Sequence, residues 1–230
     1  MNDGRRVWDP PLPRLAAIFG LVACVLVGAA VAFGSQIDTS VADRARSVRE
    51  IAQHPVAAEA SAWLFALGLI GFVPFFLGLT AALGERVLGL ARAGAAFLIA
   101  FSVMNAPANL APFVIAHDLG AGVRSGVAMS QTVAEGLLGF FRVVDAMSHV
   151  VFAIGALLTA AAMVADGRFP RWLPPVVAVG GLVMVLFSLS LAIPALELAI
   201  VFGSALTLIW VLGSSLWLLG LLRRSTSASR

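Results

Sequence analysis

The chain has 230 residues, of which 60% are hydrophobic and 12% are charged, whereas soluble domains have roughly 45–50% and about 25%. A soluble fold of this size has too little interior to bury so much apolar surface, but a bilayer solvates it. The composition therefore excludes a soluble globular domain and predicts a single membrane domain.

Six apolar runs are each long enough to cross the hydrocarbon core, which takes roughly 17–25 residues. They predict an all-α protein, a bundle of six transmembrane helices in one domain that covers residues 1–230. The predicted spans are 15–33, 56–83, 87–116, 139–165, 173–190 and 195–222.

The first run resembles a signal peptide, since arginines precede it and residues 30–32 resemble a cleavage site. Its apolar region is long, however, and five more spans follow. We therefore expect an uncleaved signal anchor. Cys24 is the only cysteine of the chain, which excludes an intramolecular disulfide and a CxxC redox pair.

Arginine placement predicts the orientation in the membrane. All 15 basic residues are arginine, and they lie mostly where apolar runs end, so the basic balance does not indicate nucleic-acid binding. With the N-terminus inside, ten arginines are cytoplasmic and five are outer, which predicts an inner (plasma) membrane protein of bacterial type with both termini in the cytoplasm. The outer five are Arg44, Arg46, Arg49, Arg124 and Arg142.

Two predicted outer loops have some length. In the first, Ser40 precedes Asp43 as in a capping box, and apolar residues recur at helical spacing from Val41 to Ala52. This pattern predicts a short amphipathic helix on the outer surface. The second loop, 120–126, is rich in glycine and predicts a flexible linker. It is not a dinucleotide-binding loop, because the spacing is wrong and no strand precedes it.

The third span carries Asn105 and Asn109 on one helical face, and Pro107 and Pro112 interrupt that helix. The fourth span carries Arg142, Asp145 and His149 at spacings of three and four, also on one face. Ionisable groups inside a bilayer are candidates for function. We expect Arg142 and Asp145 to form an ion pair, either within a functional site or as a local salt bridge beside a hydrogen-bonded histidine. For the asparagines taken alone, interhelical hydrogen bonds are the favoured interpretation.

The ionisable groups gather in the predicted outer halves of the spans, whereas the inner halves are almost wholly apolar. This asymmetry predicts an outward-facing polar vestibule. Its candidate ligand-binding residues are Glu59, Asn105, Asn109, Arg142, Asp145, His149 and Glu197. Small residues at helical spacing instead predict close helix packing, at Gly20, Cys24 and Gly28, at Gly155 and Thr159, and at Gly203, Ser204 and Thr207.

Templates for catalysis and cofactors fail. The chain has no HExxH motif, and Ser204 has no histidine near it in sequence. A bis-histidine haem site would need His117 to face His149, but we expect His117 at the outer end of the third span. No catalytic residue, metal or cofactor is predicted.

Two short motifs resemble a known family. The fourth span reads FRVVDAMSH over 141–149, and the following inner loop reads GRFPRWL over 167–173. These motifs resemble a family of bacterial six-helix membrane proteins described only as a domain of unknown function. The resemblance covers nearly the whole chain and implies six spans without an established activity. Arg142 and Asp145 match the motif, whereas Phe141 stands where a phenolic residue is expected.

Three functional hypotheses follow. The first is binding or transport of a small ligand or a proton through the vestibule. The second is a membrane scaffold or accessory subunit, in which the polar cluster only ties helices together. The third is an intramembrane enzyme, for which no nucleophile and base are visible. The expected partners are the lipid bilayer and a small ligand, not nucleic acid, and the oligomeric state stays open.

Overall fold

The computed structural model describes residues 11–37 and 43–227. All regular structure in these residues is helical, as predicted. The elements are α1 (Pro11–Gly34), α2 (Arg44–Gln53), α3 (Pro55–Ala82), η1 (Glu85–Val87), α4 (Leu88–Ala108), α5 (Ala111–Val114), η2 (Ile115–Leu119), α6 (Gly120–Arg124), α7 (Ala128–Asp166), α8 (Leu173–Ser188), η3 (Leu189–Leu191), η4 (Pro194–Leu198) and α9 (Ala199–Ser227).

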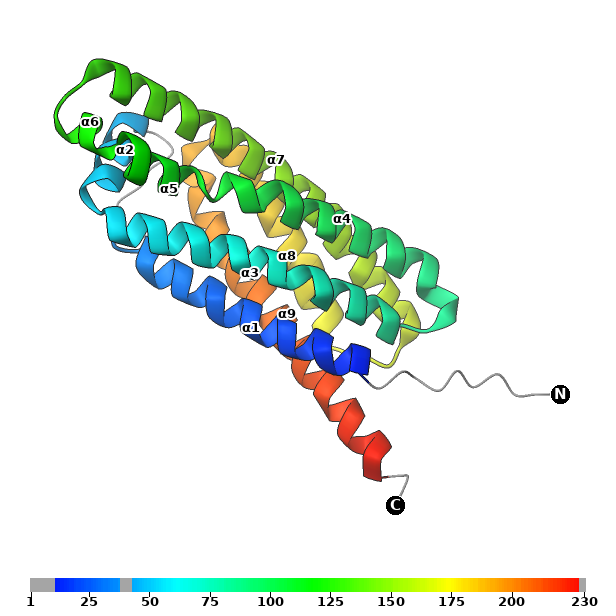
Figure 1. The fold of residues 1–230 in the computed structure, drawn as a ribbon. Coiled ribbons are helices and arrows are strands. Elements are labelled where there is room, and N and C mark those ends of the chain that lie inside the picture. The colour runs from blue at the N-terminus through cyan, green and yellow to red at the C-terminus, as the bar shows by residue number, and fades with distance from the viewer. Residues whose placement is uncertain (1–10, 38–42, 228–230) are drawn as a thin grey trace.

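Six stretches of the described chain are helical, long and apolar enough to cross a membrane, and they overlap the six predicted spans. The chain is therefore a multi-pass membrane protein with a six-helix bundle. The bundle is a closed ring in chain order, α1–α3–α4–α7–α8–α9, in which α9 returns to pack against α1. Figure 1 shows the long helices side by side, with the beginning of α1 and the end of α9 at the same end of the bundle. We call this end the Gly167 end and the opposite end the α2 end.

Two helices continue further than predicted. Helix α7 begins at Ala128 rather than at residue 139, and the third span continues through α5, a π-helical turn and α6 to Arg124. The prediction of a flexible linker over 120–126 is therefore wrong, because only the residues after Arg124 form a turn, with Gly126 at φ +74°. Gly122 permits the helical path, since a Cβ there would lie 2.2 Å from Ser130 Oγ at the start of α7.

The amphipathic helix predicted in the first outer loop is α2. Asp43 caps it by accepting a hydrogen bond from Arg46 N, while Ser40 lies outside the described residues. Its apolar side is buried and packs on η2, α6 and α7 rather than lying free on a surface. Arg124 Nη1 donates to the carbonyl of Ala52 at 2.6 Å and so satisfies an acceptor at the C-terminal end of α2. These elements form a helical cap over the α2 end.

At the Gly167 end, two loops are clamped together. Gly167 ends α7 in the left-handed region, at φ +70°. The preceding Asp166 accepts from Gly84 N, and Arg168 donates both to Asp166 Oδ1 and to the carbonyl of Ala82, with distances of 2.8–2.9 Å. The clamp fixes the α3–η1 connection against the α7–α8 loop.

Glycine pairs set how closely α4 and α7 approach. A Cβ on Gly155 would lie 3.0 Å from Gly94 O, and one on Gly94 would lie 3.1 Å from Gly155 O. The predicted packing role of Gly155 is thus confirmed. The same prediction is wrong for Gly28, because a Cβ added there would have no neighbouring atom within 4 Å.

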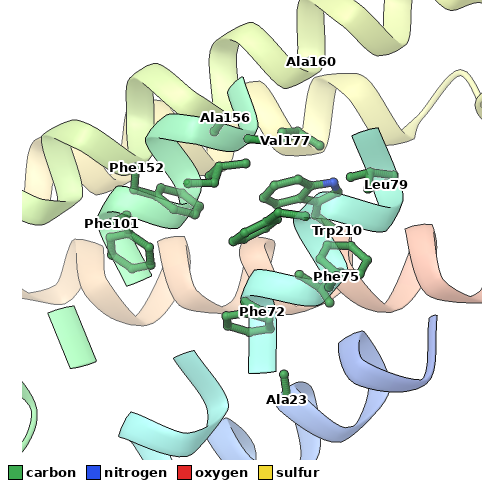
Figure 2. Close-up of a cluster of buried hydrophobic side chains, with 14 of the residues drawn as sticks. Ala23, Phe72, Phe75, Leu79, Phe101, Phe152, Ala156, Ala160, Val177 and Trp210 are labelled. Atoms are coloured by element: carbon green, nitrogen blue, oxygen red, sulfur yellow. The ribbon is translucent and has the colours of Figure 1, made fainter. Parts of the chain in front are cut away.

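The centre of the ring is filled by aromatic side chains. Trp210 of α9 packs against Phe75, Phe76 and Phe152, with ring centroids 5.8–6.3 Å apart, and Phe152 packs on Phe101 at 5.0 Å. Figure 2 shows Trp210 and Phe75 next to each other, with Phe101 and Phe152 to one side. We call Phe75, Phe76, Phe101, Phe152 and Trp210 the aromatic plug. All five are buried, and they close the middle of the bundle.

Candidate functional site

The candidate site begins where α4 ends. Pro107 lies in the last turn of α4. Asn109 and Leu110 form a turn before α5 begins at Ala111, and Pro112 lies in the first turn of α5. The interruption predicted from the two prolines is therefore present. Asn109 folds back at this break, and its Nδ2 donates to the backbone carbonyl of Asn105 at 3.0 Å and to the side-chain Oδ1 of Asn105. The proline break thus produces a paired amide at the end of the helix.

Asn105 joins α4 to α7. Its Nδ2 donates to Asp145 Oδ1 at 2.5 Å and to Ser148 Oγ at 2.7 Å. Asn105 is buried, with 2% of its surface exposed, whereas the Asp145 side chain is 29% exposed. A charge-assisted hydrogen bond of this kind is about twice as strong as a neutral one. The carboxylate is therefore held by an amide from the neighbouring helix.

His149 lies one turn after Asp145 on α7. Its Nδ1 is 2.8 Å from the Asp145 backbone carbonyl and 3.5 Å from Asp145 Oδ1. The imidazole ring stands edge-to-face between Phe101 of α4 and Phe187 of α8, with centroids 5.4 and 5.0 Å away. These contacts fix the ring against three helices.

Arg142 does not pair with Asp145 as predicted. In the described part of the chain the two side chains engage different helices, since Arg142 Nη2 donates to Ser47 Oγ of α2 at 3.2 Å while Asp145 accepts from α4. The same-helix spacing was correct, but the guanidinium extends toward the cap at the α2 end. The ion-pair prediction is therefore wrong.

Glu59, another predicted member, lies apart from this cluster. Glu59 Oε1 lies 3.6 Å from His117 Nδ1, and His117 stacks on Phe113. Glu197 lies in the η4 turn, but its side chain is outside the described part of the chain. His117 and His149 thus have different surroundings.

A cavity of about 210 Å³ opens beside Asp145 and His149. Its polar wall contains Asn105, Asn109, Asp145, His149, Ser204 and Thr207. Its apolar wall contains side chains of all six long helices, namely Val27, Phe65, Leu69, Phe72, Phe101, Phe152, Met184, Ile200 and Leu208. Four of the seven predicted vestibule residues therefore line one cavity, whereas Arg142 and Glu59 are not among its described lining residues.

The cavity lies in the half of the bundle nearer the α2 end. Asp145 is about 30 Å along α7 from Asp166, at ~1.5 Å per residue, which is about the thickness of the hydrocarbon core. Phe72 is ten residues before the end of α3 at Ala82, or about 15 Å. The polar wall is thus near one membrane interface, and the apolar wall extends toward the midplane.

Sequence reasoning missed two kinds of lining residue. Ser204 and Thr207 were assigned to helix packing because they are small, but they face the cavity. The phenylalanines of α3, α4 and α7 gave no signal, since aromatic residues are common everywhere in apolar spans. Only the ring order of the helices reveals that these positions converge.

Within the described residues, no three His, Cys, Asp or Glu side chains are grouped so as to hold a metal ion. The described lining of the cavity combines a carboxylate, an imidazole and two amides with aromatic rings.

Comparisons with known proteins add no identification: no family model matches the chain, and no curated protein and no solved structure is significantly similar to it. The family resemblance of residues 141–149 and 167–173 therefore stays a prediction.

Proposed function

We propose that the protein binds a small amphiphilic ligand in the cavity between its six helices. The observation that carries this proposal is the mixed lining of the cavity, in which Asp145, His149 and the asparagines occur together with nine apolar side chains. Ligand sites are typically apolar pockets with a few convergent polar groups. A ligand with a polar head and a small apolar body would contact both the polar and the apolar lining residues.

We further infer that the α2 end faces outward across an inner membrane of bacterial type. The support is the excess of arginines at the Gly167 end. A ligand would then enter from the outer side, at the level of Asp145. The aromatic plug favours binding over proton conduction through the bundle, because its five side chains offer no titratable group that could relay a proton.

A scaffold role is the second candidate, and one observation favours it. Asn105 hydrogen-bonds two residues of α7, so the polar cluster also ties α4 to α7. If joining these helices is the only role of the polar cluster, replacing Asn105 and Asp145 jointly with leucine should leave intact the activity of the complex that the protein scaffolds. A binding site should lose its ligand while the fold persists.

The test of ligand binding compares two substitutions on α9. Ser204→Leu adds volume inside the cavity, whereas Ala205→Leu adds it on the exposed side of the same helix. The proteins are purified in nanodiscs, and Tm is measured with a panel of short-chain alcohols, amines and carboxylates. We expect at least one compound to raise Tm by several degrees in wild type and Ala205→Leu but not in Ser204→Leu, because a ligand at about 100 times its Kd contributes ~2.7 kcal/mol.

Equal shifts in all three proteins would place binding elsewhere. If no compound in the panel shifts the wild-type Tm, the binding proposal is wrong.

A further inference from the structure

The polar wall of the cavity uses its hydrogen-bond donors internally. An ionised carboxylate only accepts hydrogen bonds, so Asp145 requires the NH2 group of Asn105 to face it. Asn105 Oδ1 must then accept, which requires Asn109 to turn its own NH2 group toward Asn105. Both hydrogens of each amide are thereby used, since the second ones go to Ser148 Oγ and to the Asn105 carbonyl. Asn109 Oδ1 is left as an acceptor.

His149 follows the same rule. A backbone carbonyl cannot donate, so the 2.8 Å contact with Asp145 O requires the proton on Nδ1. In the neutral ring, Nε2 then carries the lone pair and is the nitrogen available to the cavity. The hydroxyl of Thr207 donates to Gly203 O at 2.8 Å, which also leaves lone pairs. Ser204 carries the remaining hydroxyl of the cavity lining, which can either donate or accept a hydrogen bond.

Like these acceptor atoms, which carry negative partial charges, Asp145 makes the cavity lining electronegative. Among the described lining residues, Asp145 and His149 are ionisable and none is an arginine. The C-terminal end of α4 at Asn109 contributes roughly half a negative charge, and the N-terminal end of α9 near Ile200 contributes roughly half a positive one. These two contributions have opposite signs, and the carboxylate of Asp145, with His149 Nδ1 3.5 Å away, is the acidic group of the described lining.

The aromatic side chains of the cavity lining are suited to a cation. Phe65, Phe72, Phe101 and Phe152 come from α3, α4 and α7 and line the cavity. Aromatic faces attract ammonium groups, more strongly when water is excluded. An anion would meet a carboxylate and lone pairs beside these aromatic rings.

We propose that the ligand of this cavity is an organic cation, an ammonium group on a small apolar body, with Asp145 as its counter-ion. This inference rests on the proposed binding function and names the chemical class of the ligand.

The test uses three probes of similar shape and different charge. They are phenyltrimethylammonium, its neutral isostere tert-butylbenzene, and benzenesulfonate. Binding to the full chain is measured by equilibrium dialysis in nanodiscs of zwitterionic phosphatidylcholine, with empty nanodiscs as the blank. We expect wild type to bind phenyltrimethylammonium about tenfold more tightly than tert-butylbenzene, and benzenesulfonate most weakly.

Two variants test whether the carboxylate of Asp145 is the charge that binds the cationic probe. Asp145→Asn keeps the shape of the side chain and should lower the affinity for phenyltrimethylammonium about tenfold, with tert-butylbenzene unchanged. Glu135→Gln is the matched control, because it removes a carboxylate of the same helix that accepts from Gln131 and lies outside the cavity lining. It should change none of the three affinities.

The outcomes separate the two proposals. If wild type binds phenyltrimethylammonium and tert-butylbenzene equally, or binds benzenesulfonate most tightly, the cavity remains a binding site but the cation class is wrong. If wild type binds none of the three probes, the proposed function fails with it. The wild-type ranking decides even if Asp145→Asn does not fold.

Discussion

Asp145 shows how one residue can hold a charge at the edge of the hydrocarbon core. Its Oδ1 accepts a hydrogen bond from Asn105, and its backbone carbonyl accepts hydrogen bonds from Ser148 Oγ and His149 Nδ1. The carboxylate is therefore stabilised by a hydrogen bond from Asn105 of the neighbouring helix rather than by an adjacent guanidinium. Removing the amide would leave the carboxylate without its donor, which costs more than removing both groups.

This argument predicts which pair is energetically coupled. Asn105→Leu alone should lower the free energy of unfolding by about 1–3 kcal/mol, and adding Asp145→Leu should recover part of that loss. A parallel double-mutant cycle with Arg142→Leu and Asp145→Leu should give a smaller coupling energy than the cycle with Asn105→Leu and Asp145→Leu, because Arg142 contacts Ser47 instead. Both cycles are measured by steric trapping in bicelles. A larger coupling energy for Arg142 and Asp145 would contradict the structure.

At the scale of the helices, close approach of α4 and α7 is what brings Asn105 within reach of Asp145. The two helices cross at Gly94 and Gly155, where either added Cβ would meet the other backbone at about 3.0 Å. Helices in membranes pack closely where small residues meet, because van der Waals contact replaces the hydrophobic effect as the driving force.

Two glycine substitutions should therefore have opposite effects. Gly155→Ala should lower the free energy of unfolding by about 1–3 kcal/mol, since the added methyl group overpacks the crossing. Gly28→Ala, where nothing lies within 4 Å, should be neutral or raise it by up to ~1 kcal/mol through helix propensity. Thermal unfolding of both variants in the same detergent makes the comparison. Destabilisation of equal size in both would show that the crossing is not tightly packed.

The helices also show what the sequence could predict. Hydropathy alone located all six spans, and the prolines at 107 and 112 located the break after α4. The extension of α7 back to Ala128 was not visible, because residues 128–138 are helical through packing on α2 and α6 rather than through a continuous apolar run. The Asn105–Asp145 bond was likewise hidden, since spacing along one helix gives no information about the register between two helices.

At the scale of the whole molecule, the two ends of the bundle have different chemistry. The α2 end carries the helical cap, the cavity and a contact from Arg124 to α2. The Gly167 end carries the Asp166–Arg168 clamp, and the aromatic plug separates the two ends. Under the proposed function, a ligand enters the bundle from the α2 end.

Reporter fusions test this arrangement directly. The structure places Arg46 and Arg124 at the α2 end, and Arg86 and Arg171 at the Gly167 end. Any six-span topology thus requires fusions after Arg46 and Arg124 to report one side, and fusions after Arg86 and Arg171 to report the other. The arginine count predicts that the second pair is cytoplasmic. Paired alkaline phosphatase and fluorescent-protein fusions measure this, since each is active on only one side. A cytoplasmic signal at both Arg46 and Arg124 would reverse the orientation and turn the cavity inward, whereas a split between these two sites would contradict the six-span fold.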